Sequence, residues 1–90
     1  MATKIEAARN MLYHATWLKM QGYPFAKEAA MAKLFCTETA KEVADEAVQV
    51  FGAYALVKGN EVERHYRDQR ILQIGEGTSE IIKLVISRSL

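Results

Sequence analysis

The sequence contains one cysteine, one proline and five glycines among 90 residues. The single cysteine, Cys36, excludes an internal disulfide and a zinc site built from cysteines. Because Cys36 falls on an apolar helical stripe, we expect a buried, unreactive thiol rather than a nucleophile. Continuous apolar runs are also short: none approaches the roughly 18 residues of a membrane-spanning helix, and no signal-peptide pattern opens the chain. We therefore expect a soluble, intracellular protein.

An excess of charge of one sign is missing as well. Twelve lysines and arginines are interspersed with eleven aspartates and glutamates, and the formal net charge is +1. Such a balance creates no field that attracts a nucleic acid or an anionic membrane, so neither is an expected partner. No carboxylate or further histidine accompanies His14 or His65 at the spacing of metal ligands, and we predict no metal site.

Apolar side chains, by contrast, are abundant for so short a chain. Hydrophobic residues make up 50% of the sequence, which argues against disorder. The length predicts one domain, residues 1–90, near the lower limit of what a single core stabilises alone. The excess of apolar surface therefore predicts that a partner covers part of the domain.

The first half of the chain reads as two helices. Thr3–Glu6 has the pattern of a capping box, which would start the first helix, and Gly22 suits the position just after its end. The second helix is expected to run from Pro24, in its first turn, to about Phe51, without an internal glycine or proline.

The second half predicts two shorter helices. Asn60 and Glu63 suit a cap that opens a helix ending at about Arg70. The last helix is expected from Ser79 to about Ser87. Since no segment has the alternation of a strand, the fold class predicted is all-α, a mostly up-and-down four-helix bundle.

Two apolar lines run along the predicted long helix. The main line, whose spacing suits near-antiparallel packing, comprises Phe25, Ala29, Ala32, Cys36, Thr39, Val43, Ala47 and Val50. The second line, expected to be exposed in a single chain, comprises Ala40, Ala44, Val48 and Phe51. The link Ile71–Ile74 is expected to pack on the bundle, and the last helix is apolar nearly all round. We predict a homodimer or homotetramer formed through the long and last helices.

The stretch Gln73–Ile82, Gln-Ile-Gly-Glu-Gly-Thr-Ser-Glu-Ile-Ile, holds the main candidate for chemistry. It places Glu76 between two glycines on a turn, and the hydroxyls of Thr78 and Ser79 can cap the helix that follows. A carboxylate presented in this way can meet a substrate. An ordinary capping turn with a solvated glutamate has the same pattern, so both interpretations stay open.

Two other polar patterns also have two interpretations. Arg64, Arg67 and Arg70 share one helical face and could bind phosphate, but acidic neighbours favour a solvated face. Gln49 could contact a ligand or could simply be an exposed residue near a helix end.

Three separated motifs resemble one known family. The segment Tyr66–Arg88 is similar to the C-terminal signature of the acyl-CoA dehydrogenases, in which Arg-Asp, an apolar link and Glu-Gly-Thr-Ser-Glu/Gln-Ile precede an apolar helix. Glu28–Phe35 and Ala47–Gly52 resemble the long helix that precedes this signature, at the expected distances. The resemblance covers essentially the whole chain. It implies the C-terminal part of a longer enzyme, in the cytoplasm or, in a eukaryote, the mitochondrial matrix.

The resemblance also implies a reaction: oxidation of a fatty acyl-CoA thioester to its 2,3-enoyl form, with FAD as cofactor and a separate electron acceptor. Glu76 aligns with the base that removes the α-proton, and Gly77 with a position that leaves space for the thioester. Gly75 stands where the family often has tyrosine.

The likeness further assigns a set of positions to FAD. They are Gln49, Gly52, Ala53, Thr78 and Glu80. The last two align with positions that touch the flavin. The first three align with a segment against which the adenosine end of a neighbouring subunit's flavin lies, and Ala53 and Ala55 replace its usual glycines.

A second hypothesis belongs to a different class of protein. Since the domains that enclose flavin and acyl chain are outside these 90 residues, we expect the isolated chain to be inactive. The chain could then be a non-catalytic helical oligomerisation module.

Overall fold

The computed structural model describes all 90 residues and contains four α-helices and no strand. The α-helices are α1 (Ala2–Met20), α2 (Ala26–Phe51), α3 (Glu61–Asp68) and α4 (Ser79–Arg88). Two short 3-10 helices, η1 (Gly52–Leu56) and η2 (Gln69–Gln73), follow α2 and α3. The predicted all-α class with four helices is confirmed. None of these helices combines the length and apolar character that crossing a membrane would demand.

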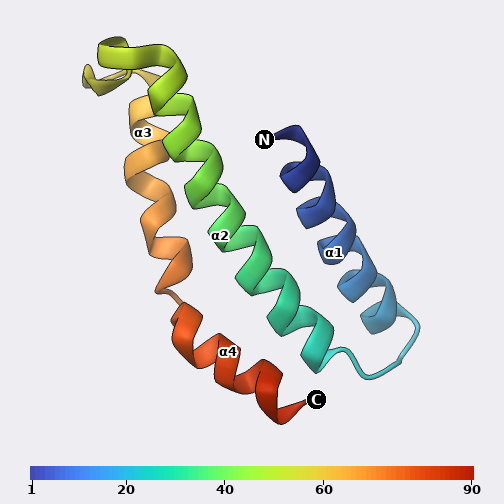
Figure 1. Ribbon diagram of the computed structural model, residues 1–90. Coiled ribbons are helices and arrows are strands. Elements are labelled where there is room, and N and C mark those ends of the chain that lie inside the picture. Colours follow the sequence, from blue (N-terminus) through green and yellow to red (C-terminus); the bar gives the residue numbers. More distant parts are fainter.

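Helix α2 lies in the middle of the molecule (Figure 1). Helix α1 runs antiparallel along one side of α2, and α3 followed by α4 runs along the other side (Figure 1). The result is a flat arrangement of three rows, with dimensions of 46 × 23 × 18 Å. Both broad faces of α2 consequently lack a covering helix.

The core of this arrangement is built from alanine. The buried hydrophobic residues are Ala15, Ala30, Ala32, Ala44 and Ala55. No large side chain is fully buried, and many, such as Trp17 (51% exposed) and Val50 (74% exposed), face outward. Small core residues let the helices approach closely but remove little apolar surface from water. The apolar excess noted in the sequence therefore remains on the surface of the single chain.

The turn between α1 and α2 differs in part from expectation. Gly22 has φ +79° and occupies the position after the end of α1, as predicted. The Tyr23 N–H donates to the Leu18 carbonyl at 3.0 Å, which completes a Schellman motif. This motif holds the chain in a non-helical course, so α2 begins only at Ala26 and the prediction that Pro24 lies in its first turn is wrong.

The start of α1 is a second correction. The helix begins at Ala2, so Thr3 lies inside it and no side chain caps its end. The Ile5 N–H already has a backbone partner in the Met1 carbonyl, at 3.0 Å. Glu6 instead pairs with Arg9, at 2.7 Å. The predicted capping box is therefore not formed.

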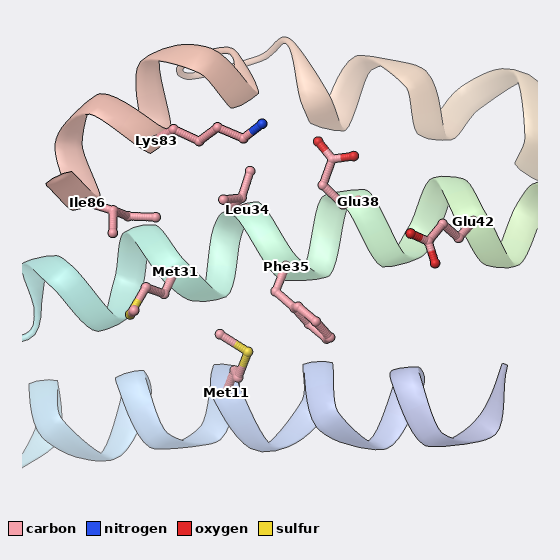
Figure 2. A pocket seen from close by; sticks show the side chains of 8 residues that line it. All are labelled: Met11, Met31, Leu34, Phe35, Glu38, Glu42, Lys83 and Ile86. Carbon is pink, nitrogen blue, oxygen red and sulfur yellow. The ribbon is translucent and has the colours of Figure 1, made fainter.

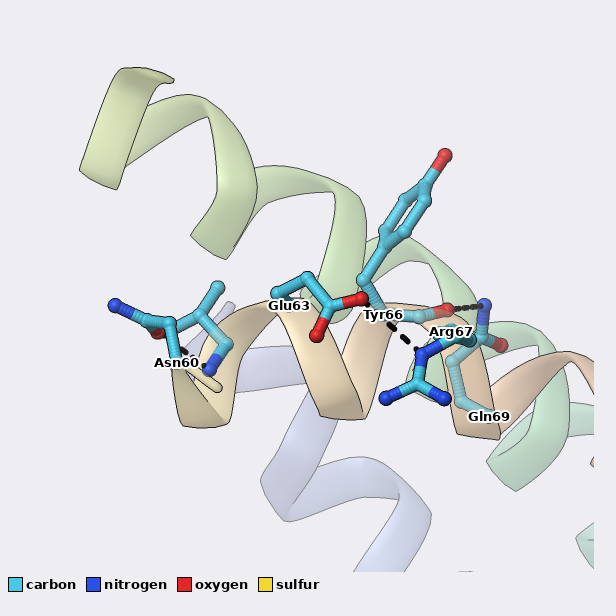
Figure 3. A network of polar contacts seen from close by, with 6 residues as sticks. Asn60, Glu63, Tyr66, Arg67 and Gln69 are labelled. Carbon is cyan, nitrogen blue, oxygen red and sulfur yellow. Dashed lines mark hydrogen bonds and ion pairs between the residues drawn. The ribbon is translucent and has the colours of Figure 1, made fainter. Parts of the chain in front are cut away.

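The cap of α3 forms as predicted at one of its two residues. The Asn60 side chain accepts a hydrogen bond from the Val62 N–H at 2.8 Å (Figure 3). Glu63 does not reach back to Asn60, because its carboxylate pairs with Arg67 at 3.1 Å (Figure 3). Arg64 likewise lies 4.0 Å from Glu61. These ion pairs support the interpretation that the face with Arg64, Arg67 and Arg70 is a solvated surface.

Burial along the apolar lines also brings corrections. Ala44, expected to be exposed in a single chain, is buried, because the row formed by α3 and η2 covers it. The link between α3 and α4 was expected to pack on the bundle, but Ile71 is 62% exposed. The 3-10 winding of η2 turns the polar Gln73 inward instead. Helix α4 packs on α2 on one side, and Ile81 and Leu84 on its other side are about half exposed.

Candidate active-site turn

The backbone between η2 and α4 forms a tight turn around Glu76. The Gly75 N–H donates to the Ile71 carbonyl at 2.7 Å. Glu76 then has φ +56°, which makes it the only non-glycine residue of the chain in the left-handed region. Its side chain is exposed, and no hydrogen bond or ion pair within the chain engages its carboxylate. The turn thus displays an unpaired carboxylate.

The two flanking glycines have different surroundings. Gly77 has φ +110°, and a Cβ there would lie 3.1 Å from Ile82 Cδ1. At Gly75 a Cβ would lie 3.2 Å from the Ile71 carbonyl oxygen, which is tighter than ordinary van der Waals contact. A side chain at Gly77 would need a positive φ that L-residues rarely adopt, and one at Gly75 would make the Ile71 carbonyl give way by a few tenths of an ångström.

The start of α4 divides its two hydroxyls between different tasks. Thr78 is the N-cap residue, and its Oγ1 accepts a hydrogen bond from the Ile81 N–H at 3.3 Å, as predicted. Ser79 does not cap the helix. Its side chain is almost wholly buried and donates a hydrogen bond to Glu38 Oε1 at 2.7 Å.

Helix α2 contributes two contacts that the sequence pattern did not reveal. Lys33 Nζ donates to the Gly77 carbonyl oxygen at 2.6 Å. Glu38 accepts hydrogen bonds from Ser79 Oγ and, at 2.9 Å, from Gln73 Nε2. The pKa of Glu38 lies below its ordinary value, chiefly because the Ser79 hydroxyl donates to it and despite its partial desolvation; the Gln73 amide and the charges of Lys83 and Lys41 lower it further. The one available signal was that Lys33 and Glu38 flank buried positions of the main apolar line.

The remaining predicted site residues lie elsewhere. Gln49 and Ala53 are exposed, and Gly52, with φ +67°, ends α2. Gln49 lies farther along α2 than Glu38, which contacts the turn, by roughly 16 Å at 1.5 Å per residue. A single chain therefore does not bring the two groups together.

The alanines that replace family glycines have different environments. Ala55 is completely buried, so its methyl group fills space inside the chain's own core. Ala53 is exposed and leaves its methyl group at the surface.

Several hollows lie along α2, and Glu76 lines none of the four formed with residues of this helix. A polar hollow of about 360 Å³ lies beside the turn, between Lys41, Arg70, Thr78 and Lys83. An apolar groove of about 520 Å³ crosses one face of α2 between α1 and α4 (Figure 2). Its lining residues are Met11, Met31, Leu34, Phe35, Glu38, Glu42, Lys83 and Ile86. No enclosed cavity thus surrounds the Glu76 carboxylate.

The structure also describes Cys36, which was predicted to be an inert thiol, and the grouping of possible metal ligands. Cys36 is half buried, its Sγ donates to the Ala8 carbonyl at 3.4 Å, and burial raises the pKa of its thiol. Histidine, cysteine and acidic side chains nowhere gather in a group of three that could hold a metal ion.

Comparison with known proteins identifies the family. All of residues 1–90 match the family model described as "Acyl-CoA dehydrogenase, C-terminal domain". The chain belongs to the acyl-CoA dehydrogenase family. It is 49% identical over all 90 residues to the probable acyl-CoA dehydrogenase YngJ of Bacillus subtilis (strain 168), of which it covers 24%. The chain therefore spans about a quarter of the length of that curated relative.

Two solved structures contain a region with the same fold. The chain is 44% identical to butyryl-CoA dehydrogenase from Megasphaera elsdenii, with a TM-score of 0.96 over 99% of this chain and 23% of that one. It is 34% identical to a protein solved as the FAD complex of PigA, with a TM-score of 0.95 and the same coverage. The resemblance to the family's C-terminal region is confirmed.

Proposed function

We propose that this chain supplies the C-terminal domain of an FAD-dependent acyl-CoA dehydrogenase in which Glu76 is the base. The reaction removes two hydrogens from a fatty acyl-CoA thioester and yields the 2,3-enoyl thioester. The observation that carries this proposal is the geometry of Glu76 in a chain of this family: a free, exposed carboxylate with φ +56° between two glycines. Strained backbone of this kind concentrates at functional sites.

The part of Glu76 in the reaction is to take the α-proton. Its carboxylate accepts the proton from the carbon next to the thioester carbonyl, and the electron pair of that C–H bond forms the new double bond. FAD, when bound, would supply the acceptor for the hydride that leaves the β-carbon. A carboxylate becomes a stronger base when water is removed from around it. The exposed Glu76 of this chain therefore needs other domains of the enzyme to close over it.

The residues assigned to FAD fit a polar cofactor. Thr78 Oγ1 uses a lone pair to accept from Ile81, so its O–H proton stays free to donate. Glu80 and Gln49 are exposed and available to a ligand. Gly52 and Ala53 would lie against the adenosine end of a flavin held by another copy of the chain. Gly77 would leave room for the thioester.

A non-catalytic assembly module is the second candidate function. It is favoured by the alanine core and the open apolar groove beside α2, since both leave apolar surface for a partner. Association as a homodimer or homotetramer is compatible with either function. In a complete enzyme, the acyl-CoA substrate and an electron acceptor would be further partners.

The experiment that separates the two functions is a chimera. The chain replaces the matching segment of the Bacillus subtilis relative, and Glu76→Gln is compared with the unmodified chimera. Glutamine keeps shape and hydrogen-bonding capacity but accepts no proton. We expect near-normal flavin content, read from absorbance, and turnover lower by roughly 10²–10⁴, the usual contribution of a positioned base.

One result would contradict the catalytic role of Glu76, and another would contradict the expected inactivity of the isolated chain. If the Gln variant turns over at the unmodified rate, the base lies elsewhere. The isolated 90-residue chain is the comparison sample, and we expect it neither to retain flavin nor to reduce a dye in the presence of acyl-CoA. If the isolated chain does either, the expectation that it is inactive alone is wrong.

A further inference from the structure

We propose that Lys33 and Glu38 are positioning residues that hold Glu76 in its left-handed geometry from helix α2. This inference rests on the proposed function, in which Glu76 is the base. The two residues belong to one helix, and each contacts the turn on a different atom. Neither touches the Glu76 carboxylate, so each would act through the backbone that presents it.

Lys33 fixes the peptide group between Gly77 and Thr78, just after Glu76. Its Nζ donates to the Gly77 carbonyl oxygen at 2.6 Å in a partly buried contact. A charged donor makes a stronger hydrogen bond than a neutral one, and partial burial protects it from competing water. Gly77 has φ +110°. Because glycine has no Cβ, this residue has access to several other backbone conformations, and the hydrogen bond from Lys33 favours the observed one.

Glu38 fixes the chain on both sides of Glu76. Gln73 and Ser79 lie three residues before and three residues after it, and their side chains are 7% and 8% exposed. Both donate to the Glu38 carboxylate, at 2.9 and 2.7 Å. Arg70 donates to the other end of the Gln73 amide, Oε1, at 3.0 Å, which orients Nε2 toward Glu38. One carboxylate therefore anchors both ends of the seven-residue turn.

The turn itself has little else to keep this geometry. An L-residue with positive φ is intrinsically disfavoured, and the Glu76 side chain makes no compensating contact. Lys33 and Glu38 are about 7.5 Å apart along a continuous helix, so the anchors are rigid relative to each other. Removing either anchor lets the carboxylate move away from the α-carbon of a bound thioester.

The chimera described above provides the kinetic test, with Lys33→Met as the main variant. Methionine keeps an unbranched side chain but cannot donate to Gly77. Lys27→Met is the matched control, because Lys27 lies on the same helix but makes no hydrogen bond to the turn. We expect Lys33→Met to lower kcat about 10- to 100-fold, the effect of displacing a catalytic group by about 1 Å, with flavin content and KM nearly unchanged.

Variants at Glu38 test the second anchor. Glu38→Ala removes the acceptor for both Gln73 and Ser79 and should lower kcat as strongly as Lys33→Met. Glu38→Gln keeps one acceptor oxygen and should be intermediate. Equal rates for both Glu38 variants and the unmodified chimera would overturn the role of Glu38.

A double variant distinguishes positioning from general damage. If Lys33 acts through Glu76, then Lys33→Met should cost less than about twofold when Glu76 is already glutamine. A full, multiplicative loss in that background would show that Lys33 acts elsewhere and would overturn the inference. If Glu76→Gln alone leaves the rate unchanged, the proposed function fails, and the anchoring is then decided by exchange rather than by rate.

Amide hydrogen exchange gives that separate readout. We expect Lys33→Met to speed exchange of the Gly75 and Ile81 amides at least about tenfold, since both belong to the anchored turn. Amides in the middle of α1 should not change, and Lys27→Met should leave the turn as it is. Unchanged exchange at the turn in Lys33→Met would overturn the inference, whatever the catalytic rate.

Discussion

Glu76 is unusual because its backbone conformation is unfavourable and no partner of its own side chain explains it. A left-handed L-residue costs about 1–2 kcal/mol, and Glu76 is the only such residue in the chain. In an ordinary capping turn a glycine at this position would remove that cost. The chain instead keeps a carboxylate there and places glycine at both neighbours, where Cβ atoms would crowd Ile71 and Ile82. This pattern favours a functional role for the Glu76 side chain over an ordinary capping turn.

The pH dependence of stability provides a prediction for Glu38. Its pKa is lowered from 4.5 in the folded chain, chiefly by the hydrogen bond from Ser79. The unfolded chain therefore binds this proton more readily, and the stabilisation is present above the ordinary pKa and is lost as the pH falls through the folded value. We expect the difference in Tm between the unmodified chain and Glu38→Gln to shrink as the pH falls from neutral through 4.5 and below. A difference that stays constant in thermal unfolding followed by circular dichroism would contradict this.

The candidate site was predictable where its residues are neighbours in sequence. The Gly-Glu-Gly-Thr order predicts a turn, an exposed carboxylate and a cap, because each depends on local backbone geometry. The anchors were not predictable in this way. Lys33 is 44 positions from Gly77, and Glu38 is 41 from Ser79. Only the packing of α4 on α2 determines these contacts.

Helix ends show the same distinction. Asn60 and Thr78 cap their helices as the sequence predicts, since each bonds an amide two or three positions away. The Thr3–Glu6 pattern failed because Ala2 and Thr3 are both helical, which places Thr3 inside the helix rather than at its N-cap. Pro24 was misplaced because the Schellman motif at Gly22 sets the direction of the chain before α2 can start. A local motif therefore predicts an end correctly only where no neighbouring motif competes with it.

The cap of α3 leads to a second stability prediction. The helix has eight residues, too few to be stable alone, so its start depends on the bond from the Val62 N–H to Asn60. Asn60→Ala should destabilise the chain by about 1 kcal/mol, which lowers Tm by about 4–8 °C in a domain of this size. Asn60→Asp keeps the acceptor and should stay close to the unmodified chain. If alanine and aspartate give the same Tm, the cap does not contribute.

The whole molecule consists of three rows with one long helix in the middle. Its buried residues are small, and the larger apolar side chains on α2 and α4 remain near the surface. The sequence predicted the helices and the excess of apolar residues correctly. It did not predict that α3 and η2 would cover Ala44, because that choice depends on how the second half folds back along α2. A flat chain of this kind leaves an apolar groove that another surface must cover to remove it from water.

Self-association is therefore the last prediction. We expect the 10.2 kDa chain to form a dimer or tetramer through α2 and α4 at micromolar concentration, measured by sedimentation equilibrium. Leu84→Glu places a charge on the exposed side of α4 and should shift the equilibrium toward the single chain, because burying an unpaired charge is unfavourable. Leu12→Glu on α1 is the matched control, since Leu12 and Leu84 are 50% and 51% exposed and only Leu84 belongs to the predicted interface. A single 10.2 kDa species would show that the chain does not associate. Equal disruption by both variants would show that the contact surface lies elsewhere.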